Sequence, residues 1–483
     1  MAGIFKAYDI RGIVGDGLTA ARAYLVGRAL AETVFGSTEE KAQPGLQPIV
    51  VSHDMRTHSP ELTRELVRGL CEGGCSVIDI GLAATPMNYW ANVHYQSSGS
   101  VTVTASHNGP QYNGFKVSAA GALPVDYATG LDRVEAYVLR AEAQSQPPAP
   151  TSSAGTRTEI KDALTLYLDF MNRFVQVPAQ GEGTQLGRKY ARSRSSHRLK
   201  IGIDTANGMG GFFLPAFFAR YDWVEVVPLY WELDGTFPNH EADPLKEENL
   251  RDVQKLVTDN NCDFGVAYDG DADRCMFVDE VGCNISSDLV TALIAAEMLE
   301  RNPGQHILYD LRSSRVVPEW IAEQGGVPVR GRVGHSFMKR LLRDKKAPFG
   351  GELSGHYYFA DCFHTDSGLM AMIQVMNIWH KRQHNGSTPL SQLVAPLRKY
   401  SATGEMNFRV TDVPGILARI EEHYGAQGAR LDHLDGLTVE FDDWWFNLRS
   451  SNTEPLLRLN LEASDEEARD NRLQDVKQLI SSS

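Results

Sequence analysis

The sequence predicts an α/β protein made of three similar units and a smaller α+β unit at its C-terminal end. Its 483 residues allow three or four domains, and an apolar content of 42% is enough for several buried cores. In three places an apolar strand ends at an aspartate and opens into a polar turn, at 49–54, 201–204 and 307–310. Recurrence at the size of a domain favours three related α/β units over a solenoid, whose period is shorter.

The last unit shows a different order of elements. Met406-Asn407-Phe408-Arg409-Val410 is typical of a strand, and a helical pattern follows over 416–424. One strand is predicted over 436–448, another over 456–461, and a charged helix from Asp465. Strands and helices in this order fit a small α+β domain.

Composition marks the boundaries between units. Residues 143–157 are rich in Gln, Pro, Ser and Ala, which is typical of a linker or a long surface loop. A turn at Gly282 precedes a helical pattern over 289–299, where a new unit begins. We therefore predict domains at 1–145, 157–282, 283–397 and 401–483.

Charge and cysteine content narrow the class of protein. A net charge of −14 does not favour a nucleic-acid partner, although a local group of Arg and Lys can still hold an anionic substrate. The basic stretch 181–200 is interpreted as a solvated loop, because a single tyrosine, Tyr190, stands among its charges and no series of aromatic residues alternates with them. Six cysteines without paired spacing indicate reduced thiols. With no signal core and no long apolar stretch, we expect a cytoplasmic protein without a membrane partner.

A serine loop is the first candidate for chemistry. The alternating run 101–104 predicts a strand that delivers Ser106 into a loop, followed by His107 and Asn108. Lys116 comes after a turn at Asn113-Gly114, so that its ammonium group can return towards the hydroxyl, and lysine binds phosphate as a point charge. A serine that caps a helix in an ordinary loop is the structural alternative.

A second loop carries three carboxylates. Asp269, Asp271 and Asp273 alternate along the chain, and Arg274 follows at once. Hard oxygen ligands at this spacing suit Mg²⁺. An EF-hand calcium loop is the competing interpretation, since Glu280 stands at its twelfth position. Arg274 occupies the place of the required glycine, and the flanking residues look like strands, so we predict a Mg²⁺ site with room for a phosphate oxygen.

Two further loops gather polar side chains. Residues 350–356 place a carboxylate, a hydroxyl and an imidazole in a glycine-rich turn that could hold sugar hydroxyls. Residues 449–455 place a guanidinium with hydroxyl and amide groups that can cradle a phosphate. Arg11 precedes a glycine turn, and His335 follows another glycine; taken singly, each is more often structural than catalytic.

Taken in order along the chain, these segments resemble the α-D-phosphohexomutase superfamily, and within it the bacterial phosphomannomutase/phosphoglucomutase group. The resemblance runs from Tyr8-Asp9-Ile10-Arg11-Gly12 to Arg449-Ser450-Ser451-Asn452-Thr453-Glu454-Pro455. It implies three related mixed α/β domains plus a C-terminal α+β domain of the TATA-binding-protein-like type, around a central cleft to which each domain contributes a loop.

The resemblance also implies roles for individual residues. Ser106 would be the phosphoserine and a metal ligand, with Asp269, Asp271 and Asp273 as the other ligands of Mg²⁺. The catalytic candidates are Ser106, Lys116, Arg11, Arg274 and His335, of which Lys116, Arg11 and His335, in that order, are candidates for proton transfer. Residues expected to bind substrate are His107, Arg312, Glu352, Ser354, His356, Arg449, Ser451, Asn452 and Thr453.

Two positions depart from the motifs of the group. Gly109 stands before Pro110, where the serine loop commonly continues His-Asn-Pro, and this predicts altered flexibility without loss of activity. Leu353 replaces the methionine of Gly-Glu-Met-Ser-Gly-His, which conserves volume and polarity. The phosphoglucosamine mutases resemble Gly-Glu-Gln-Ser-Gly-His, so the apolar Leu353 argues against an amino sugar.

The function implied is that of a Mg²⁺-dependent phosphomannomutase that interconverts mannose 6-phosphate and mannose 1-phosphate. A hexose 1,6-bisphosphate would be both intermediate and activator, and glucose phosphates are possible further substrates. The alternatives are a phosphoglucomutase, a Mg²⁺ phosphatase, and a non-catalytic sugar-phosphate-binding protein on the same fold. Small-molecule hexose phosphates are the expected partners, and the chain is expected to be a monomer or dimer.

Overall fold

The computed structural model describes residues 3–36, 47–144, 150–151, 153–176, 198–383, 388–450 and 456–481. The basic stretch 181–200 lies mostly outside the described residues, as does part of the predicted linker 143–157. The chain forms two compact units: unit 1 consists of Met1–Ile285 with Ser354–Ser391, and unit 2 of Ser286–Leu353 with Gln392–Ser483. Among the helices in the described part of the chain, none is both long and apolar enough to cross a membrane.

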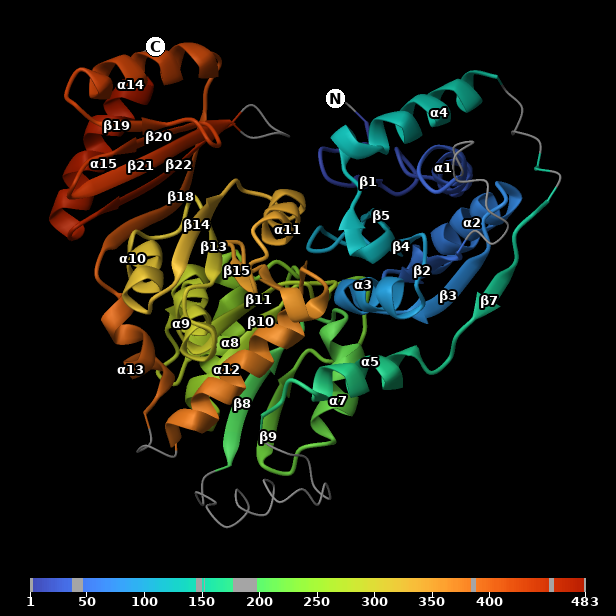
Figure 1. Ribbon diagram of the computed structural model, residues 1–483, viewed down its shortest axis with the longest axis horizontal. Helices are drawn as coiled ribbons and strands as arrows, with labels where there is room; N and C mark the ends of the chain where they lie inside the picture. Colours follow the sequence, from blue (N-terminus) through green and yellow to red (C-terminus); the bar gives the residue numbers. More distant parts are fainter. Residues whose placement is uncertain are drawn as a thin grey trace. The chain divides into compact units, whose positions relative to one another are not determined.

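Unit 1 begins with a mixed sheet (Figure 1). Four parallel strands, in the order β4-β2-β3-β7, are extended by β5 and β1, each antiparallel to its neighbour. The bounds are β1 Ile10–Ile13, β2 Ile49–His53, β3 Val77–Leu82, β4 Gly99–Val103, β5 Tyr112–Ala119, β6 Leu123–Pro124 (paired with β5) and β7 Arg157–Glu159. Short 3₁₀ turns follow β5 and β6, at Ala120–Ala122 and Tyr127–Thr129.

Helices cover both faces of this sheet. The helices α1 Ala20–Thr33, α2 Ser59–Glu72 and α4 Leu131–Ala143 form one core with alternate residues of the strands, such as Ile49 and Val51 of β2. Ser52, on the other face of β2, meets α3 (Thr85–His94) through a hydrogen bond from Asn88 Nδ2 of 2.8 Å. The alternation along β2 therefore places its side chains in two different layers.

The second sheet of unit 1 has the order β12-β11-β10-β8-β9. β8, β9 and β10 are parallel, and β11 turns back antiparallel to β10. The bounds are β8 Leu199–Asp204, α7 Gly210–Phe218, β9 Val224–Leu229, 3₁₀ helix Glu247–Leu250, α8 Arg251–Asn260, β10 Phe264–Tyr268, β11 Cys275–Asp279 and β12 Asn284–Ile285. Val253 and Val257 of α8 pack on the sheet at Ala267 and Val278.

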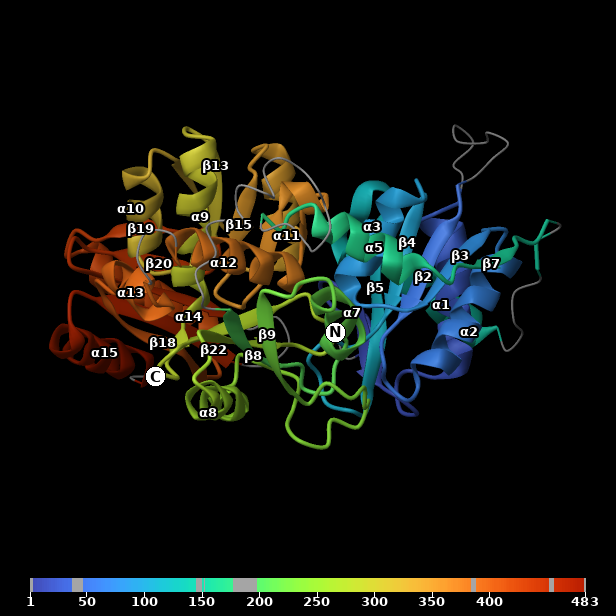
Figure 2. The same cartoon turned by 90° about the horizontal axis from the view of Figure 1, so that it is seen from below.

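A short helix, α5 (Ala163–Asn172), lies beside α3 (Figures 1 and 2), and aromatic rings of the two helices are in contact. The ring of Trp90 on α3 lies 5.8 Å from that of Tyr167, and Phe170 stacks on Phe363 at 5.4 Å.

Unit 1 closes with β16 Tyr357–Phe359, 3₁₀ helix Ala360–Cys362, β17 Thr365–Asp366 and α12 Gly368–Gln383, where β16 and β17 pair antiparallel. Strands β16 and β17 belong to unit 1, whereas the three strands that precede them along the chain belong to unit 2.

Unit 2 contains three parallel strands in the order β14-β13-β15 and a separate antiparallel sheet. The bounds of the first part are α9 Ser287–Arg301, β13 His306–Asp310, α10 Val316–Glu323, β14 Val327–Gly331, α11 His335–Asp344 and β15 Phe349–Gly351. Helix α13 (Leu390–Val394) and a 3₁₀ turn (Ala395–Leu397) lead into the second part.

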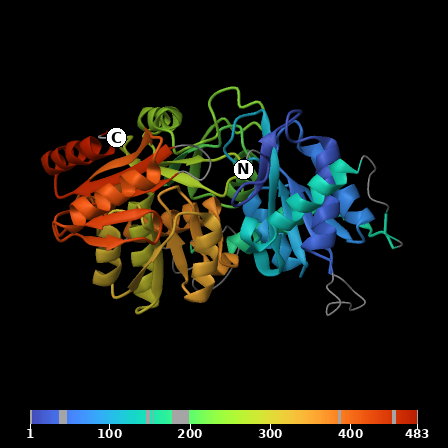
Figure 3. The same ribbon diagram turned by 90° about the horizontal axis from the view of Figure 1, so that it is seen from above.

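The C-terminal sheet has the order β18-β22-β21-β20-β19 (Figure 3). Its bounds are β18 Ser401–Arg409, α14 Val413–Gly425, β19 Arg430–Asp432, β20 Leu437–Glu440, β21 Trp444–Ser450, β22 Leu456–Ala463 and α15 Glu466–Ser481. Ile416 and Ile420 of α14 and Val476 and Ile480 of α15 share one core with the strands. The predicted helices over 416–424 and from Asp465 are confirmed.

The single strand predicted over 436–448 is wrong. The structure has a hairpin there, in which β20 and β21 pair antiparallel with Val439 opposite Phe446. The apolar residues of both strands merge into one sequence pattern because the turn between them, 441–443, contains Phe441. The edge strand β19 was also missed, since three residues are too few to show a period.

The three strand-to-aspartate segments prove to share one hydrogen-bond pattern. A carboxylate oxygen of Asp54 accepts from the backbone N–H of Arg56 at 3.0 Å, that of Asp204 from Ala206 at 2.8 Å, and that of Asp310 from Arg312 at 2.7 Å. An aspartate that binds its own backbone two residues on closes a tight turn. Each aspartate therefore sets the direction of the chain where it leaves the carboxyl end of a parallel strand.

Helices α1 and α2 cross at two glycines. A Cβ atom on Gly27 would lie 2.2 Å from Leu66 O, and one on Gly69 would lie 2.2 Å from Tyr24 O. We expect Gly27→Ala to lower the free energy of unfolding by about 1–3 kcal/mol, since the added methyl forces the helices apart. In an open helix the same change is stabilising by roughly 0.5–1 kcal/mol, so the sign is diagnostic.

Urea unfolding checks this expectation. Gly425→Ala serves as a control, because its Cβ would meet only Leu431 Cδ1, at 3.5 Å, at the end of α14. A Gly27→Ala protein as stable as the wild type would contradict the close crossing.

Candidate active site

Ser106 lies in the loop after β4, buried and held from several sides. Its backbone adopts φ of 51°, and its N–H donates to Thr104 Oγ1 at 2.9 Å. Its hydroxyl donates to Asp269 Oδ2 at 2.9 Å, and Arg274 Nη2 approaches the same hydroxyl at 3.4 Å. A left-handed conformation is uncommon for a residue with a side chain, and such positions concentrate at functional sites.

Arg56 holds the serine loop through hydrogen bonds to its backbone. Its guanidinium donates to four carbonyl oxygens of the loop, those of Ser106 (2.7 Å), Asn108 (2.6 Å), Gly109 (2.8 Å) and Tyr112 (3.2 Å). It also pairs with Asp54 at 3.1 Å. This role is not among those predicted from the sequence. A signal was present, because Asp54 and Arg56 have the same spacing as Asp310 and Arg312.

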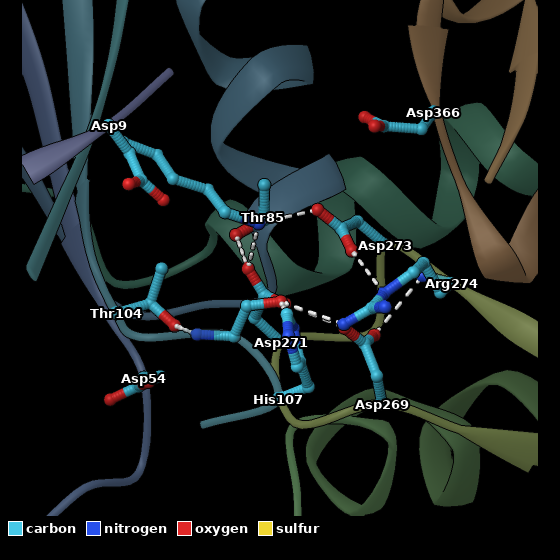
Figure 4. Close-up of polar contacts among 12 residues, drawn as sticks. Asp9, Asp54, Thr85, Thr104, His107, Asp269, Asp271, Asp273, Arg274 and Asp366 are labelled. Atoms are coloured by element: carbon cyan, nitrogen blue, oxygen red, sulfur yellow. Dashed lines mark hydrogen bonds and ion pairs between the residues drawn. The ribbon is translucent and has the colours of Figure 1, made fainter. Parts of the chain in front are cut away.

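The three aspartates occupy the turn between β10 and β11 (Figure 4). One carboxylate oxygen from each of Asp269, Asp271 and Asp273 lies within 4.8 Å of the others, and all three residues are buried. A Cβ on Gly270 would lie 2.4 Å from Ser106 O, so only glycine lets the two loops approach this closely. Strands flank the turn, which excludes the EF-hand interpretation because an EF-hand loop joins two helices.

Two cations lie among these carboxylates. Lys116 Nζ is 2.6 Å from Asp271 Oδ2 and 2.6 Å from Asp273 Oδ2, and Arg274 Nε is 3.0 Å from Asp269 Oδ2. Although burial opposes charge, the aspartates raise the pKa of Lys116, so this lysine is protonated. Burial by itself would raise the pKa of the Asp271 carboxyl. Lys116 and the hydrogen bond from Thr85 outweigh it, so that this pKa is lowered.

The donor set fits Mg²⁺. Three carboxylates at short mutual distance offer the hard oxygen ligands that this ion prefers, and burial raises the pKa of the Asp269 carboxyl well above its usual range, so a bound cation would stabilise its charged form. Asp271 Oδ1 is buried and has no hydrogen-bond partner in the described part of the chain. An oxygen in that position is what a metal ligand requires.

His107 and Arg11 border the serine. His107 Nδ1 lies 3.3 Å from Ser106 Oγ, and burial together with the cations of Arg274 and Arg11 holds the pKa of its imidazole well below the usual range. His107 is therefore neutral. Arg11 comes from β1 and donates to Asn108 Oδ1 and Asp9 Oδ2.

Part of the predicted sugar loop also belongs to unit 1. Ser354 Oγ and His356 Nδ1 are 2.9 Å apart, and Arg274 and His356 form an antiparallel bridge. His356 Nε2 lies 3.7 Å from Asp273 Oδ1 and 3.8 Å from Asp366 Oδ2. The imidazole is thus next to the carboxylates, and Asp366, which the sequence reasoning missed, is buried beside it.

The remaining predicted residues belong to unit 2. Glu352 Oε1 accepts the backbone N–H of Gly334 at 2.7 Å, which brings the sugar-loop carboxylate next to the start of α11 at His335. Arg312 Nη2 pairs with Asp310 Oδ2 at 2.7 Å, and the same oxygen accepts the N–H of Leu353 at 2.8 Å. Ser451, Asn452 and Thr453 lie outside the described residues.

Arg449 is anchored by a carboxylate that the sequence reasoning missed. Glu405 of β18 binds Arg449 Nη2 at 2.6 Å, Arg458 Nη1 at 3.2 Å and Arg312 Nη1 at 3.6 Å. Glu405 thus links the predicted phosphate loop to the strand end at Asp310. No motif marks it, because its partners come from three distant segments.

This cluster predicts a dependence of stability on pH. Burial opposes ionisation of Glu405, but Arg449, Arg312 and Arg458 prevail and lower the pKa of its carboxyl. A group with a lowered pKa stabilises the fold above its unfolded pKa and loses that contribution as pH falls through the folded value. We expect Glu405→Gln to cost on the order of 1–2 kcal/mol at pH 7. The difference from the wild type should shrink from about pH 5 downwards.

Hydrogen exchange of peptides from β18 and β21 at pH 7 and pH 4, corrected for intrinsic rates, measures this local stability. Glu422→Gln is the matched control, since Glu422 is exposed on α14. A difference between Glu405→Gln and the wild type that does not change with pH would rule out the ionised carboxylate as its cause.

Comparison with known proteins gives matches along nearly the whole chain. Four models described as phosphoglucomutase/phosphomannomutase match: α/β/α domain I at residues 2–145, α/β/α domain II at 184–282, α/β/α domain III at 286–400 and the C-terminal domain at 405–478. A protein of Xanthomonas campestris named phosphohexose mutases is 35% identical over 477 residues, covering 99% of this chain and 98% of that protein.

Two relatives named phosphomannomutase are similar at the same level. The protein of Salmonella montevideo is 35% identical and covers 99% of both chains, and that of Methanocaldococcus jannaschii is 36% identical, with 99% of this chain and 97% of that protein covered. The crystal structure of a phosphoglucomutase/phosphomannomutase family protein from Burkholderia thailandensis superposes with a TM-score of 0.83 at 30% identity, covering 99% of this chain and 97% of that one. The expected fold class is confirmed, and the chain belongs to the phosphoglucomutase/phosphomannomutase family of the α-D-phosphohexomutase superfamily.

Proposed function

We propose that this protein is a Mg²⁺-dependent phosphomannomutase that also acts on glucose phosphates. The observation that carries the proposal is the buried Ser106 hydroxyl, which lies between the Asp269 carboxylate and the Arg274 guanidinium. A serine placed there can carry a phosphoryl group within reach of a cationic side chain. Relatives named phosphomannomutase, about 35% identical over their full length, support the choice of sugar.

In the proposed reaction, phospho-Ser106 donates its phosphoryl group to a hydroxyl of a hexose phosphate. The bond from phosphorus to Ser106 Oγ breaks as the sugar oxygen bonds to phosphorus, which gives a hexose 1,6-bisphosphate. The bisphosphate turns over, and its other phosphoryl group returns to Ser106. Arg274 stabilises charge on the transferring group, which is where such a transition state needs help. Mg²⁺ bound by Asp269, Asp271 and Asp273 would supply further charge neutralisation.

Proton transfer at the sugar hydroxyl needs a base and, at the serine oxygen, an acid. Lys116 is held in its protonated form by Asp271 and Asp273, so we assign it the role of a cation and not that of the base. Arg11 is engaged with Asp9 and Asn108 through its guanidinium, so we assign it a role in holding the serine loop. His335, next to the Gly334 amide that binds Glu352, is then the candidate for the base.

The substrate-binding roles follow the chemistry of the loops. We propose that Glu352, Ser354 and His356 bind the sugar hydroxyls, with His107 and Arg312 as further contacts to the substrate. Arg449, with Ser451, Asn452 and Thr453, would bind the phosphate that is not transferred. Glu405 holds Arg449 through its carboxylate, and an incoming phosphate would present the same negative charge to that guanidinium.

Removal of Ser106 tests the phosphoserine. We expect Ser106→Ala to lose steady-state turnover by several orders of magnitude, because no phosphoenzyme can form. Ser464→Ala, at an exposed serine, should keep full activity and the added phosphate in its intact mass. A Ser106→Ala protein of near-normal activity would overturn the mechanism, and a wild-type protein that releases inorganic phosphate from the bisphosphate as its main product would be a phosphatase.

Competition between sugars tests the specificity. ³¹P NMR of the protein with Mg²⁺, a trace of glucose 1,6-bisphosphate, and mannose 1-phosphate and glucose 1-phosphate in one tube follows both conversions. We expect mannose 1-phosphate to become the 6-phosphate at a rate comparable with or above that of glucose 1-phosphate. If only glucose 1-phosphate reacts, the protein is a phosphoglucomutase, and if neither reacts, it is a binding protein on a mutase fold.

A further inference from the structure

Thr85 makes two hydrogen bonds to Asp271, which lies in the turn between β10 and β11 that carries the three aspartates (the carboxylate loop). Its hydroxyl donates to Asp271 Oδ2 at 2.5 Å, and its backbone N–H donates to Asp271 O at 3.1 Å (Figure 4). Thr85 is fully buried and 186 residues away from Asp271 in the chain. A pair of bonds to one residue fixes both the position of the backbone of Asp271 and the rotation of its side chain.

The partners of Asp271 are unevenly distributed between its two oxygens. Oδ2 accepts from Thr85 and, at 2.6 Å, from Lys116 Nζ. Oδ1 is buried and has no hydrogen-bond partner among the residues that the structure describes. One oxygen is therefore saturated by donors while the other is kept for a ligand, and a carboxylate that binds a metal through one oxygen needs this arrangement.

Helix α3 gives Thr85 a fixed position. Thr85 is its first residue, and the helical N–H that has no partner within the helix is used on Asp271. Further along the helix, Asn88 Nδ2 donates to Ser52 Oγ at 2.8 Å and to Val101 O at 3.2 Å. Asn92 Nδ2 donates to Ser100 Oγ and Ala119 O, both at 3.0 Å. These bonds tie α3 to β2, to β4, which leads into the loop of Ser106, and to β5, which carries Lys116.

We propose that Thr85 is a positioning residue for the metal: its hydroxyl holds Asp271 so that Oδ1 faces the cation. The inference rests on the proposed function, because it concerns the Mg²⁺ site of that reaction. It goes further in assigning the orientation of one ligand to a residue of the serine-bearing domain. Metal affinity then depends on α3, which is itself anchored to the neighbouring strands through Asn88 and Asn92.

The test compares Thr85→Val, which keeps the shape and removes the hydroxyl, with Thr85→Ser, which keeps the hydroxyl. Mn²⁺ serves as the probe in place of Mg²⁺, and its binding to the unphosphorylated protein is titrated by electron paramagnetic resonance without substrate. We expect Thr85→Val to weaken Mn²⁺ binding about 10- to 100-fold, as is typical when a group that orients a metal ligand is lost. Thr85→Ser should bind within about threefold of the wild type.

A matched control separates this role from simple loss of a buried hydrogen bond. Thr63 is buried on α2, and its hydroxyl donates to Ser59 O at 2.7 Å, away from the carboxylates. Thr63→Val should leave Mn²⁺ affinity unchanged. In turnover, Thr85→Val should raise the Mg²⁺ concentration for half-maximal rate by the same factor, while KM for the sugar phosphate at saturating Mg²⁺ stays near the wild-type value.

The outcomes are distinct. If Thr85→Val binds Mn²⁺ as tightly as the wild type, or if Thr85→Ser is as weak as Thr85→Val, the positioning role is overturned while the proposed function stands. If the wild type itself binds no Mn²⁺, the metal assignment fails and the inference falls with it. Should Thr85→Val not fold, Thr85→Ser and Thr85→Ala, compared in the same titration, decide between the two.

Discussion

The compensation of charge among three buried carboxylates is the constraint on which unit 1 depends. Asp269, Asp271 and Asp273 lie within 4.8 Å of one another, and like charges at this distance in a buried site repel strongly. Lys116 and Arg274 offset part of this repulsion, and the two cations come from different domains of the fold. The charge pattern therefore holds the serine-bearing sheet and the carboxylate turn together.

The serine loop is held next to these carboxylates by contacts of its own. Arg56 binds four of its carbonyl oxygens, and Gly270 allows the carboxylate turn to approach Ser106 closely enough for the hydroxyl to reach Asp269. The left-handed backbone of Ser106 is maintained by these contacts. The left-handed Ser106, Gly270 and the buried Arg56 thus form one structural feature.

Unit 2 also contains a cluster of charged side chains, but there the positive charges outnumber the negative ones. There a single carboxylate, Glu405, lies among three guanidinium groups, and Arg312 is also bound by the aspartate that ends β13. An excess of positive charge around one acid suits a region that we propose to receive a phosphate. In both units the aspartate at the end of a parallel strand orients the backbone from which the charged groups project.

The sequence by itself determined the class of fold and most candidate residues, because the strand-to-aspartate turns, the serine loop and the alternating carboxylates are each set by local chemistry within a few residues. Asp269, Asp271, Asp273 and Arg274 could be singled out as a candidate metal loop for that reason. Only the tertiary structure revealed Thr85, Arg56 and Glu405, whose partners lie far away in the chain. The tertiary structure also placed Lys116 against two aspartates that are distant from it in the chain. The charge state of a buried lysine depends on such neighbours, so it could not be inferred from the sequence.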